Sequence, residues 1–292
     1  MFEILSRQML TPNICRMKVN APMVARAALP GQFLIVRESE KGERIPLTIS
    51  DYDAAAGTVT IVTQSIGAST IRICDKSVGD SFADIVGPLG NPSDFVSWSD
   101  EALRAEKFVF LAGGVGSAPV YPQAKWLKEH GADVTVILGA RTKALLIYVD
   151  ELRSVSTSLE IGTDDGSFGF KGNIPALLEH LVVDEGRSFT RCVAIGPMIM
   201  MKFSTLMATK LSIPVVVSLN TLMVDGTGMC GACRVSVDGK TRFACVDGPE
   251  FDGTKVDFDE AMRRQRQYLA SEKVAREKVE NEKDCACAQR GI

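Results

Sequence analysis

Three cysteines and one aspartate follow one another with a spacing that is typical of metal ligands. Asp225 stands five residues before Cys230, Cys233 follows three residues later, and Cys245 lies farther along the chain. Plant-type 2Fe–2S proteins use C-x4-C-x2-C plus a distant fourth cysteine, so here the first ligand position holds aspartate. The residues between the ligands are small: Gly226, Gly228, Gly231 and Ala232. Because small residues let the backbone wrap closely around a cluster, the pattern favours an iron–sulfur site.

Two other interpretations of these cysteines stay open. Cys230 and Cys233 also have the spacing of a zinc knuckle, and the three thiols could be ordinary buried side chains. A zinc site usually has a second close pair, and this segment has none. Buried thiols would leave the small residues of the loop without an explanation. The iron–sulfur cluster is therefore the preferred interpretation.

The aspartate itself allows two interpretations. A carboxylate is anionic and can bind ferric iron, so Asp225 would preserve the charge of a thiolate although oxygen is a harder donor than sulfur. Alternatively, Asp225 forms a turn with Gly226, which is a common use of that pair. Cys285 or Cys287, near the end of the sequence, would then supply the missing thiolate. We expect Asp225 to be the fourth ligand.

Composition is that of an ordinary globular protein. Of 292 residues, 46% are hydrophobic and 24% charged, and a net charge of −3 gives no nucleic-acid footprint. Neither an apolar run of transmembrane length nor a signal-peptide core is evident, so we expect a cytoplasmic protein. In a reducing compartment eight cysteines indicate metal or redox chemistry, with Cys15, Cys74 and Cys192 as buried thiols. His130 and His180 are expected at the surface, so a histidine-based active site is not expected.

Residues 1 to about 98 read as short strands separated by turn formers. The strand-like segments are CRMKVNA, QFLIVRE, TVTIVTQ and DSFADIV. Many short strands with regular turns predict a small antiparallel barrel. Within it, residues 67–70 open a predicted helix, STIRICDK, and such a start offers free N–H groups to a pyrophosphate. Many helices begin with Ser or Thr for capping alone, so this signal by itself is weak.

From Lys107 the chain alternates strands and helices. A buried strand over residues 108–112 precedes a GGVG turn at 113–116 and a helix that starts near Pro119. Two further strands, SLEIGTD and RCVAIGP, enclose the helix NIPALLEHL. This alternation predicts a doubly wound nucleotide-binding domain over about 103–220. A generic α/β domain with a tight turn is the alternative.

After about Asp259 the chain is strongly charged and rich in helix formers, and its apolar stripe is thin. We expect a solvated helix there, slightly favoured over a helix that docks a partner. The segment Cys285-Ala286-Cys287 is expected to be an unstructured tail with reactive thiols.

In this order, the strand-rich part, the alternating part and the cysteine loop resemble the ferredoxin–NADP reductase-like electron-transfer family with a C-terminal iron–sulfur module. The resemblance covers about residues 1–260. Two branches are similar: the electron-transfer subunit of dihydroorotate dehydrogenase, and the small (alpha) subunit of NADH-dependent ferredoxin:NADP oxidoreductase, also called sulfide dehydrogenase beta subunit. The second is favoured, because that branch has three cysteines and one aspartate where the first has four cysteines.

The resemblance implies a β plus α/β fold in four parts. These are an N-terminal antiparallel FAD-binding β-barrel at 1–100, a doubly wound NAD-binding α/β domain at 101–220, a small 2Fe–2S cluster module at 221–258 and a charged helical tail at 259–292.

It also assigns binding residues. The flavin-binding segment corresponds to Arg44, Pro46, Leu47 and Thr48, with proline in the place of a tyrosine. The pyrophosphate-binding motif corresponds to Gly67, Ser69 and Thr70, and the barrel-closing GPLG motif to residues 87–90. The nicotinamide-nucleotide turn corresponds to Gly113, Gly114, Gly116, Ser117 and Pro119. Later nucleotide-binding segments carry Arg141, Asp164, Asp165, Gly196 and Pro197. The metal ligands would be Asp225, Cys230, Cys233 and Cys245.

As a mechanism, the resemblance implies that NAD(H) exchanges a hydride with FAD, which can release electrons singly to the 2Fe–2S cluster. Hydride transfer needs no acid–base side chain, so no catalytic residue is expected. NADH is expected to be preferred over NADPH, because Asp164 and Asp165 would repel a 2′-phosphate, although Arg141 and Lys143 would attract it.

The implied partner is a larger flavoprotein with its own FAD and 4Fe–4S clusters. The resulting heterodimer would split NADPH oxidation between ferredoxin and NAD+. One alternative is the electron-transfer subunit of an NAD-dependent dihydroorotate dehydrogenase. Another, of a different class, is a zinc-stabilised nucleotide-binding module that acts by interaction.

Overall fold

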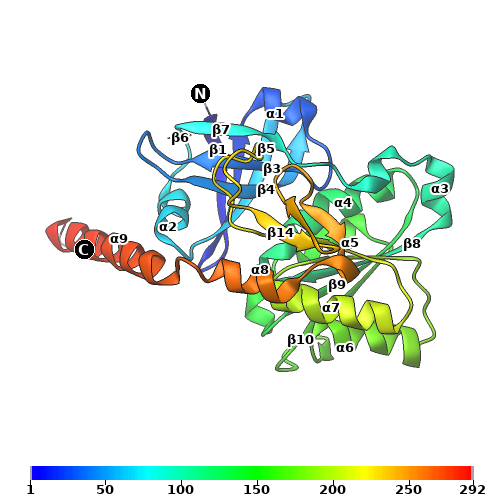
Figure 1. Cartoon of the computed structure of the whole chain (residues 1–292). Helices are drawn as coiled ribbons and strands as arrows, with labels where there is room; N and C mark the ends of the chain where they lie inside the picture. Colours follow the sequence, from blue (N-terminus) through cyan, green and yellow to red (C-terminus); the bar gives the residue numbers. More distant parts are fainter. Residues whose placement is uncertain (1, 291–292) are drawn as a thin grey trace.

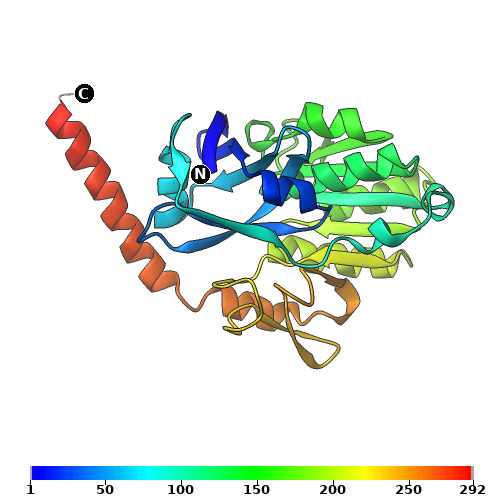
Figure 2. The same ribbon diagram turned by 90° about the horizontal axis from the view of Figure 1, so that it is seen from above.

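The computed structural model describes the backbone of residues 2–290 and the side chains of residues 2–282. Over that part of the chain, the strands form two seven-stranded sheets and one two-stranded ribbon (Figure 1, Figure 2). The predicted β plus α/β fold is confirmed. Among the described helices, none is both long enough and apolar enough to cross a membrane.

The first sheet is an antiparallel barrel with the strand order β6-β1-β2-β5-β4-β3-β7. Its strands are β1 (Phe2–Thr11), β2 (Ile14–Asn20), β3 (Phe33–Arg37), β4 (Arg44–Asp53), β5 (Thr58–Gln64), β6 (Ser81–Phe82) and β7 (Asp84–Leu89). Its helices are α1 (Pro22–Ala27) and α2 (Ala68–Asp75), the second of which the sequence predicted. Successive residues of a strand point to opposite faces. On β3, Leu34 and Val36 therefore lie in the barrel core, whereas Phe33 and Ile35 belong to a different apolar group.

The second sheet has the order β11-β10-β9-β8-β12-β13-β16 and is parallel except at β16. Its strands are β8 (Lys107–Gly113), β9 (Asp133–Ala140), β10 (Ser158–Thr163), β11 (Phe170–Lys171), β12 (Arg191–Ile195), β13 (Val215–Ser218) and β16 (Glu250–Asp252). Its helices are α3 (Asp100–Ala105), α4 (Ser117–Glu129), α5 (Val149–Val155), α6 (Ile174–Glu179) and α7 (Met198–Lys210). Separate apolar cores cover the two faces, one beneath α4 and α5 and the other beneath α6 and α7, which confirms the doubly wound arrangement.

Between β13 and β16 the chain leaves this sheet and returns to it. We call the intervening residues 219–249 the cluster segment. It contains the ribbon of β14 (Arg234–Val237) and β15 (Lys240–Phe243). On its return, β16 pairs antiparallel with β13 and becomes the edge strand of the sheet.

Two helices end the described chain, α8 (Phe258–Gln265) and α9 (Leu269–Arg290). The expected solvated helix is wrong for α8, because Phe258 and Ala261 are buried in the core that α7 covers. The remainder, α9, contacts α2 and then runs past the barrel (Figure 2). An unstructured end is also wrong, since α9 continues to Arg290; the side chains of residues 285 and 287 lie outside the described part.

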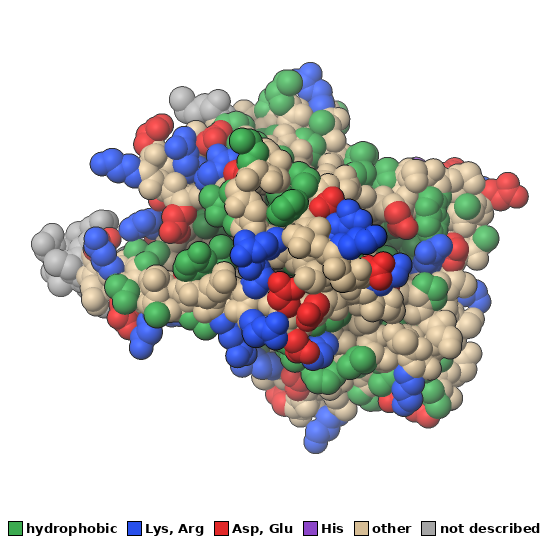
Figure 3. Space-filling view, in the orientation of Figure 1, with side chains coloured by type: hydrophobic (Ala, Val, Ile, Leu, Met, Phe, Trp, Pro, Cys, Tyr) green, Lys and Arg blue, Asp and Glu red, His purple; other side chains and the backbone are tan. Residues whose placement is uncertain are grey.

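Charged side chains of both signs are mixed over the face that carries these helices and the cluster segment (Figure 3). This mixture agrees with the small net charge and gives no single-sign field on that face.

Candidate functional site

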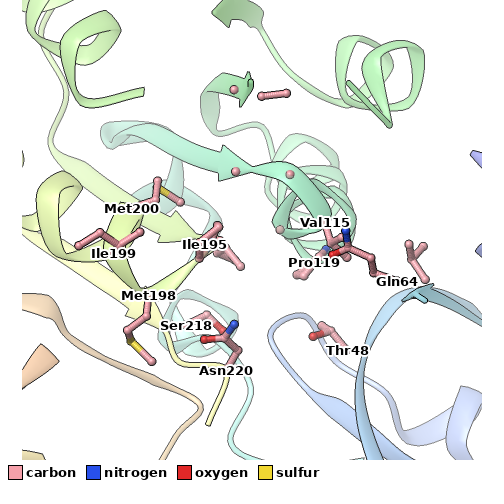
Figure 4. Close-up of a pocket in the computed structure, with 18 of the residues that line it drawn as sticks. Thr48, Gln64, Val115, Pro119, Ile195, Met198, Ile199, Met200, Ser218 and Asn220 are labelled. Atoms are coloured by element: carbon pink, nitrogen blue, oxygen red, sulfur yellow. The ribbon is translucent and has the colours of Figure 1, made fainter. Parts of the chain in front are cut away.

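A cavity of about 970 Å³ opens between the barrel and the α/β sheet. Thr48 and Gln64 reach it from barrel strands, and Val115, Pro119 and Ile195 reach it from the α/β side (Figure 4). Most of its lining side chains are apolar. A cavity of this volume, with mainly apolar walls and a smaller set of polar groups, is typical of a site for a cofactor.

The α/β sheet contributes the carboxyl ends of its strands to this cavity. β8 ends at Gly113, β9 at Ala140 and β12 at Ile195, and all three residues line it. The chain builds outward from β8 to β9 and β10, then crosses back to β12 on the other side of β8. Open α/β sheets bind their ligands at such a switch point, outside the carboxyl ends of the strands. The GGVG turn therefore lies where a dinucleotide would bind.

Close backbone contact explains the glycines of this turn. A Cβ atom on Gly116 would lie 2.2 Å from the carbonyl oxygen of Ile195, so no larger residue fits without a backbone shift. Gly114 has a φ of +56°, and its carbonyl oxygen accepts a hydrogen bond of 2.8 Å from Ser117 Oγ. Because α4 starts at Ser117, its unpaired N–H groups begin beside the cavity, which suits an anionic phosphate.

The start of α2 uses its polar groups internally. Thr70 Oγ1 accepts hydrogen bonds from the N–H groups of Ile66 and Gly67, each at 3.0 Å. The hydroxyl of Ser69 donates to the carboxylate of Glu43. Of the residues predicted to bind a pyrophosphate here, Thr70 alone lines the cavity. The capping role that the sequence left open is therefore present, and the pyrophosphate role stays a prediction.

The two neighbouring acidic residues after β10 lie in different surroundings. Asp164 lines the cavity together with Arg141. Asp165 does not; its carboxylate accepts hydrogen bonds from Ser167, at 2.9 Å from the N–H and 2.6 Å from the hydroxyl. These bonds, the hydroxyl bond foremost, lower the pKa of Asp165. Only Asp164 is thus free to meet a ligand in the cavity.

Asp225 organises the loop that precedes the cysteines. Its Oδ1 accepts hydrogen bonds from the N–H of Thr227 at 2.5 Å and from its hydroxyl at 2.9 Å. Its Oδ2 accepts one of 2.9 Å from the N–H of Cys230. The Thr227 backbone bond, with help from Cys230, lowers the pKa of Asp225 to about 2, so the carboxylate is charged at neutral pH. The turn interpretation therefore describes part of what Asp225 does, and its role as a metal ligand stays a prediction.

Two of the three cysteines are brought together. Cys233 Sγ and Cys245 Sγ lie 3.2 Å apart and are buried, whereas Cys230 is exposed. Among the described residues, no three His, Cys, Asp or Glu side chains gather closely enough to hold a metal ion. Gly228 and Gly231, two residues before and one residue after Cys230, both have positive φ, a backbone conformation that favours glycine.

The chemistry of these residues fits an iron–sulfur cluster. Two adjacent buried sulfurs, a third thiol and a carboxylate that is charged at neutral pH share one short stretch of chain, and iron clusters are held by such anionic donors. Burial, and then the Cys233 thiol, raise the pKa of Cys245 to about 12, so metal binding there requires the loss of a proton.

The predicted residues divide into two groups. Those that line the cavity are Pro46, Leu47, Thr48, Thr70, Gly113, Gly114, Gly116, Pro119, Arg141, Asp164, Gly196 and Pro197. Those that do not are Arg44, Gly67, Ser69, Ser117 and Asp165, together with the four predicted metal ligands.

Sequence reasoning missed other lining residues, among them Gln64, Ser218, Met223 and Gln265. Ser218 ends the parallel strand β13, so the rule that located Gly113 could have found it. Gln265 comes from α8, and its Nε2 donates to the backbone oxygen of Asn220 at 2.7 Å. Its spacing in the sequence carries no signal for such a contact.

Comparison with known proteins gives a consistent set of similarities. The model of the iron–sulfur cluster binding domain of dihydroorotate dehydrogenase B matches residues 220–257. A dihydroorotate dehydrogenase B electron transfer subunit homolog from Thermotoga maritima is 46% identical, over 94% of each chain. The dihydroorotate dehydrogenase B (NAD(+)) electron transfer subunit of Desulforamulus reducens is 31% identical, over 87% of this chain and 96% of its own.

A solved structure is similar over almost the whole chain. It is a chain of the NADH-dependent reduced ferredoxin-NADP oxidoreductase, a structure described in terms of flavin-based electron bifurcation. It is 44% identical and superimposes with a TM-score of 0.87, covering 95% of this chain and 97% of its own.

Proposed function

The chain belongs to the family of dihydroorotate dehydrogenase B electron-transfer subunits, and within it we propose an FAD- and 2Fe–2S-containing subunit that exchanges a hydride with NAD(H) and passes single electrons to or from a larger flavoprotein. One observation carries this proposal. The wall of a single cavity is shared by Thr48 of the barrel, the GGVG turn of the α/β sheet and Met223 of the cluster segment. Such a cavity would hold a flavin and a nicotinamide together, next to the cluster segment.

The lining of the cavity suits hydride exchange. Among its described residues, only Arg141 and Asp164 have ionisable side chains, and both follow strand ends of the α/β sheet. FAD, when bound, supplies the step between two-electron and one-electron chemistry. The chain's own contribution is to position the reacting rings and to exclude water with apolar walls, such as Pro46 and Ile195.

The larger enzyme that we propose is a ferredoxin:NADP oxidoreductase of the electron-bifurcating type. The support is the 44% identity and the near-complete coverage of the ferredoxin-NADP oxidoreductase chain. Asp225 also agrees with that branch, where an aspartate stands beside three cysteines. In this proposal the partner carries its own FAD and 4Fe–4S clusters, and this chain provides the NAD(H) side of the reaction.

A second candidate is the electron-transfer subunit of an NAD-dependent dihydroorotate dehydrogenase. The matched iron–sulfur model and the 31% identical relative both carry that name. The two candidates differ in the partner and in the reductant, and they share the cofactors of this chain. The match to an iron–sulfur domain also favours a cluster over the zinc alternative.

The test is anaerobic reconstitution of the full chain with FAD, iron and sulfide. We expect a visible spectrum with flavin and iron–sulfur bands, and reduction of an artificial acceptor by NADH. NADPH-driven reduction of ferredoxin should appear only after addition of the co-purifying partner. A colourless zinc protein, or efficient NADPH-driven ferredoxin reduction by the single chain, would contradict the proposal. A partner that oxidises dihydroorotate would establish the second candidate.

A further inference from the structure

The cluster segment is seated on the outer side of the barrel. Phe33 and Ile35 project from β3 away from the barrel core and form one apolar group with Cys233 and Cys245. In both ribbon views the segment lies alongside the barrel strands (Figure 1, Figure 2). The contact is close, because a Cβ atom on Gly226 would lie 2.7 Å from Ile35 Cδ1. A glycine at this position thus lets the loop approach the strand.

Arg44, the first residue of β4, is hydrogen-bonded to the same loop, residues 224–233. Its Nε donates a hydrogen bond of 2.9 Å to the carbonyl oxygen of Val224, and its Nη2 donates one of 3.2 Å to that of Asp225. The Asp225 carboxylate in turn accepts from the N–H groups of Thr227 and Cys230. One guanidinium therefore fixes the backbone from which the Asp225 side chain orders the cysteine loop.

Strand β4, which begins at Arg44, also forms part of the cavity wall. Residues 45–48 follow Arg44 directly and line the cavity, whereas Arg44 does not. Phe33 and Met223 provide a second connection, since both line the cavity and both belong to the apolar group of the two buried cysteines. A ligand that orders this wall will therefore also restrict the loop.

We propose that Arg44 is a positioning residue that couples occupancy of the cavity to the order of loop residues 224–233. The family resemblance assigns Arg44 to the flavin, and the structure shows its guanidinium donating to two loop carbonyls. The identity of the ligand, FAD, rests on the proposed function. Coupling between two sites is reciprocal, so an ordered loop also tightens binding in the cavity.

The test is amide hydrogen exchange on the full chain without iron, in the absence and presence of FAD. In the wild type, FAD should slow exchange of the Thr227 and Cys230 amides about fivefold or more, which is the lower end of typical coupling between sites. Arg44→Lys keeps the charge but loses the two-pronged contact. It should speed exchange of these amides without FAD and remove the effect of FAD on their exchange. Because the coupling is reciprocal, FAD affinity should fall by about the same factor, fivefold or somewhat more.

Arg37→Lys is the matched control. Arg37 pairs in register with Arg44 on the neighbouring strand, and its guanidinium donates to the carbonyl oxygen of Glu40 at 3.3 Å rather than to a carbonyl of residues 224–233. This variant should behave as the wild type. The inference is overturned if Arg44→Lys leaves exchange of the two amides unchanged, or if it weakens FAD binding more than tenfold while the loop stays protected. Failure of FAD to bind the wild type would instead count against the proposed function, and the exchange measured without FAD would still decide the role of Arg44.

Discussion

The carboxylate of Glu250 on β16 accepts a hydrogen bond from the side-chain amide of Gln123 on α4, with 2.9 Å between Oε1 and Nε2. The same oxygen accepts from Ser93 Oγ at 3.0 Å. Ser93 follows β7, the last barrel strand, and Glu250 begins β16 directly after the cluster segment. The Glu250 carboxyl group therefore links the end of the barrel to α4 and β16 of the α/β domain. Burial, and then the nearby Asp94 carboxylate, raise the pKa of Glu250 from its ordinary value of 4.5 to about 7.

This raised pKa predicts how stability depends on pH. Between pH 4.5 and about 7 the folded chain keeps a proton that the unfolded chain has lost, so the free energy of unfolding falls as pH rises through this window. The loss from this group is at most about 3 kcal/mol. Glu250→Gln keeps the shape and removes the titration, so it should melt several degrees higher than the wild type at pH 8, and the difference should vanish near pH 4.

Thermal melting from pH 4 to 8 checks this expectation. Glu160→Gln is a suitable control, because the Glu160 carboxylate is paired with Arg187 at 2.7 Å and its loss should not stabilise the chain at pH 8. A Glu250→Gln variant that is no more stable than the wild type at pH 8 would show that the carboxyl is solvated in the native state.

Asp164 should set the preference for NADH. It lines the cavity and would repel a 2′-phosphate, whereas the neighbouring Asp165 is engaged by Ser167 outside the cavity. Asp164→Asn should reduce the NADH over NADPH ratio of kcat/KM about five- to tenfold, the effect of one charge contact of roughly 1 kcal/mol. Asp165→Asn should leave the ratio unchanged. Steady-state rates with a dye acceptor give both numbers, and equal effects of the two variants would refute the distinction.

Two substitutions test whether Asp225 is a metal ligand or only orders the loop through its hydrogen bonds. Asp225→Cys supplies an anionic ligand but no carboxylate for the Thr227 and Cys230 amides, whereas Asp225→Asn keeps one acceptor oxygen and loses the charge. If Asp225 binds iron, the Cys variant should retain a 2Fe–2S cluster with a changed spectrum and the Asn variant should lose it or hold it weakly. Iron and sulfide content and the visible spectrum measure this.

The opposite order of cluster retention in these variants would make Asp225 an organiser of the loop alone. A truncation before Cys285 tests the tail in the same assay. We expect it to leave the cluster unchanged, and loss of the cluster on truncation would mean that the tail supplies a thiolate.

The GGVG turn offers a matched pair of glycine variants. Gly116→Ala places its Cβ 2.2 Å from the carbonyl oxygen of Ile195, and should cost about 3 kcal/mol or more. A Cβ on Gly114 meets no atom within 4 Å, so Gly114→Ala should cost only the backbone penalty of its positive φ, about 1 kcal/mol. Thermal melting compares the stabilities of the two variants. A larger loss of stability for Gly114→Ala would contradict the close contact between Gly116 and Ile195.

Sequence periodicity was sufficient to predict those elements whose structure depends only on neighbouring residues. The helix at 68–75, the buried strand at 107–113 and the turn that follows it are each specified by neighbouring residues, and all three are present. The strand β16 could not be predicted in this way, because its partner β13 lies far back in the chain. Its charged flanks and three-residue length also give no strand pattern.

The candidate site follows the same division. The glycines of the turn and Asp164 could be located from motifs, since strand ends converge at the switch point. Arg44 and Val224 are 180 residues apart in the sequence, although their groups form a hydrogen bond. The contact of Gln265 with Asn220 depends on how α8 packs against the rest of the chain. Such contacts are set by tertiary packing, which spacing in a single sequence does not encode.

Ser218, the last residue of β13, and Glu250, the first of β16, are register partners in the antiparallel pair. The chain thus departs from and re-enters the sheet at one point, and the excursion between them is topologically a hairpin loop of unusual length. A connection of two to five residues closes ordinary hairpins. The cluster segment is therefore a self-contained insertion: its removal and a short bridge from Ser218 to Glu250 would leave the order of the strands in both seven-stranded sheets unchanged, and a different segment could be grafted between the same two residues.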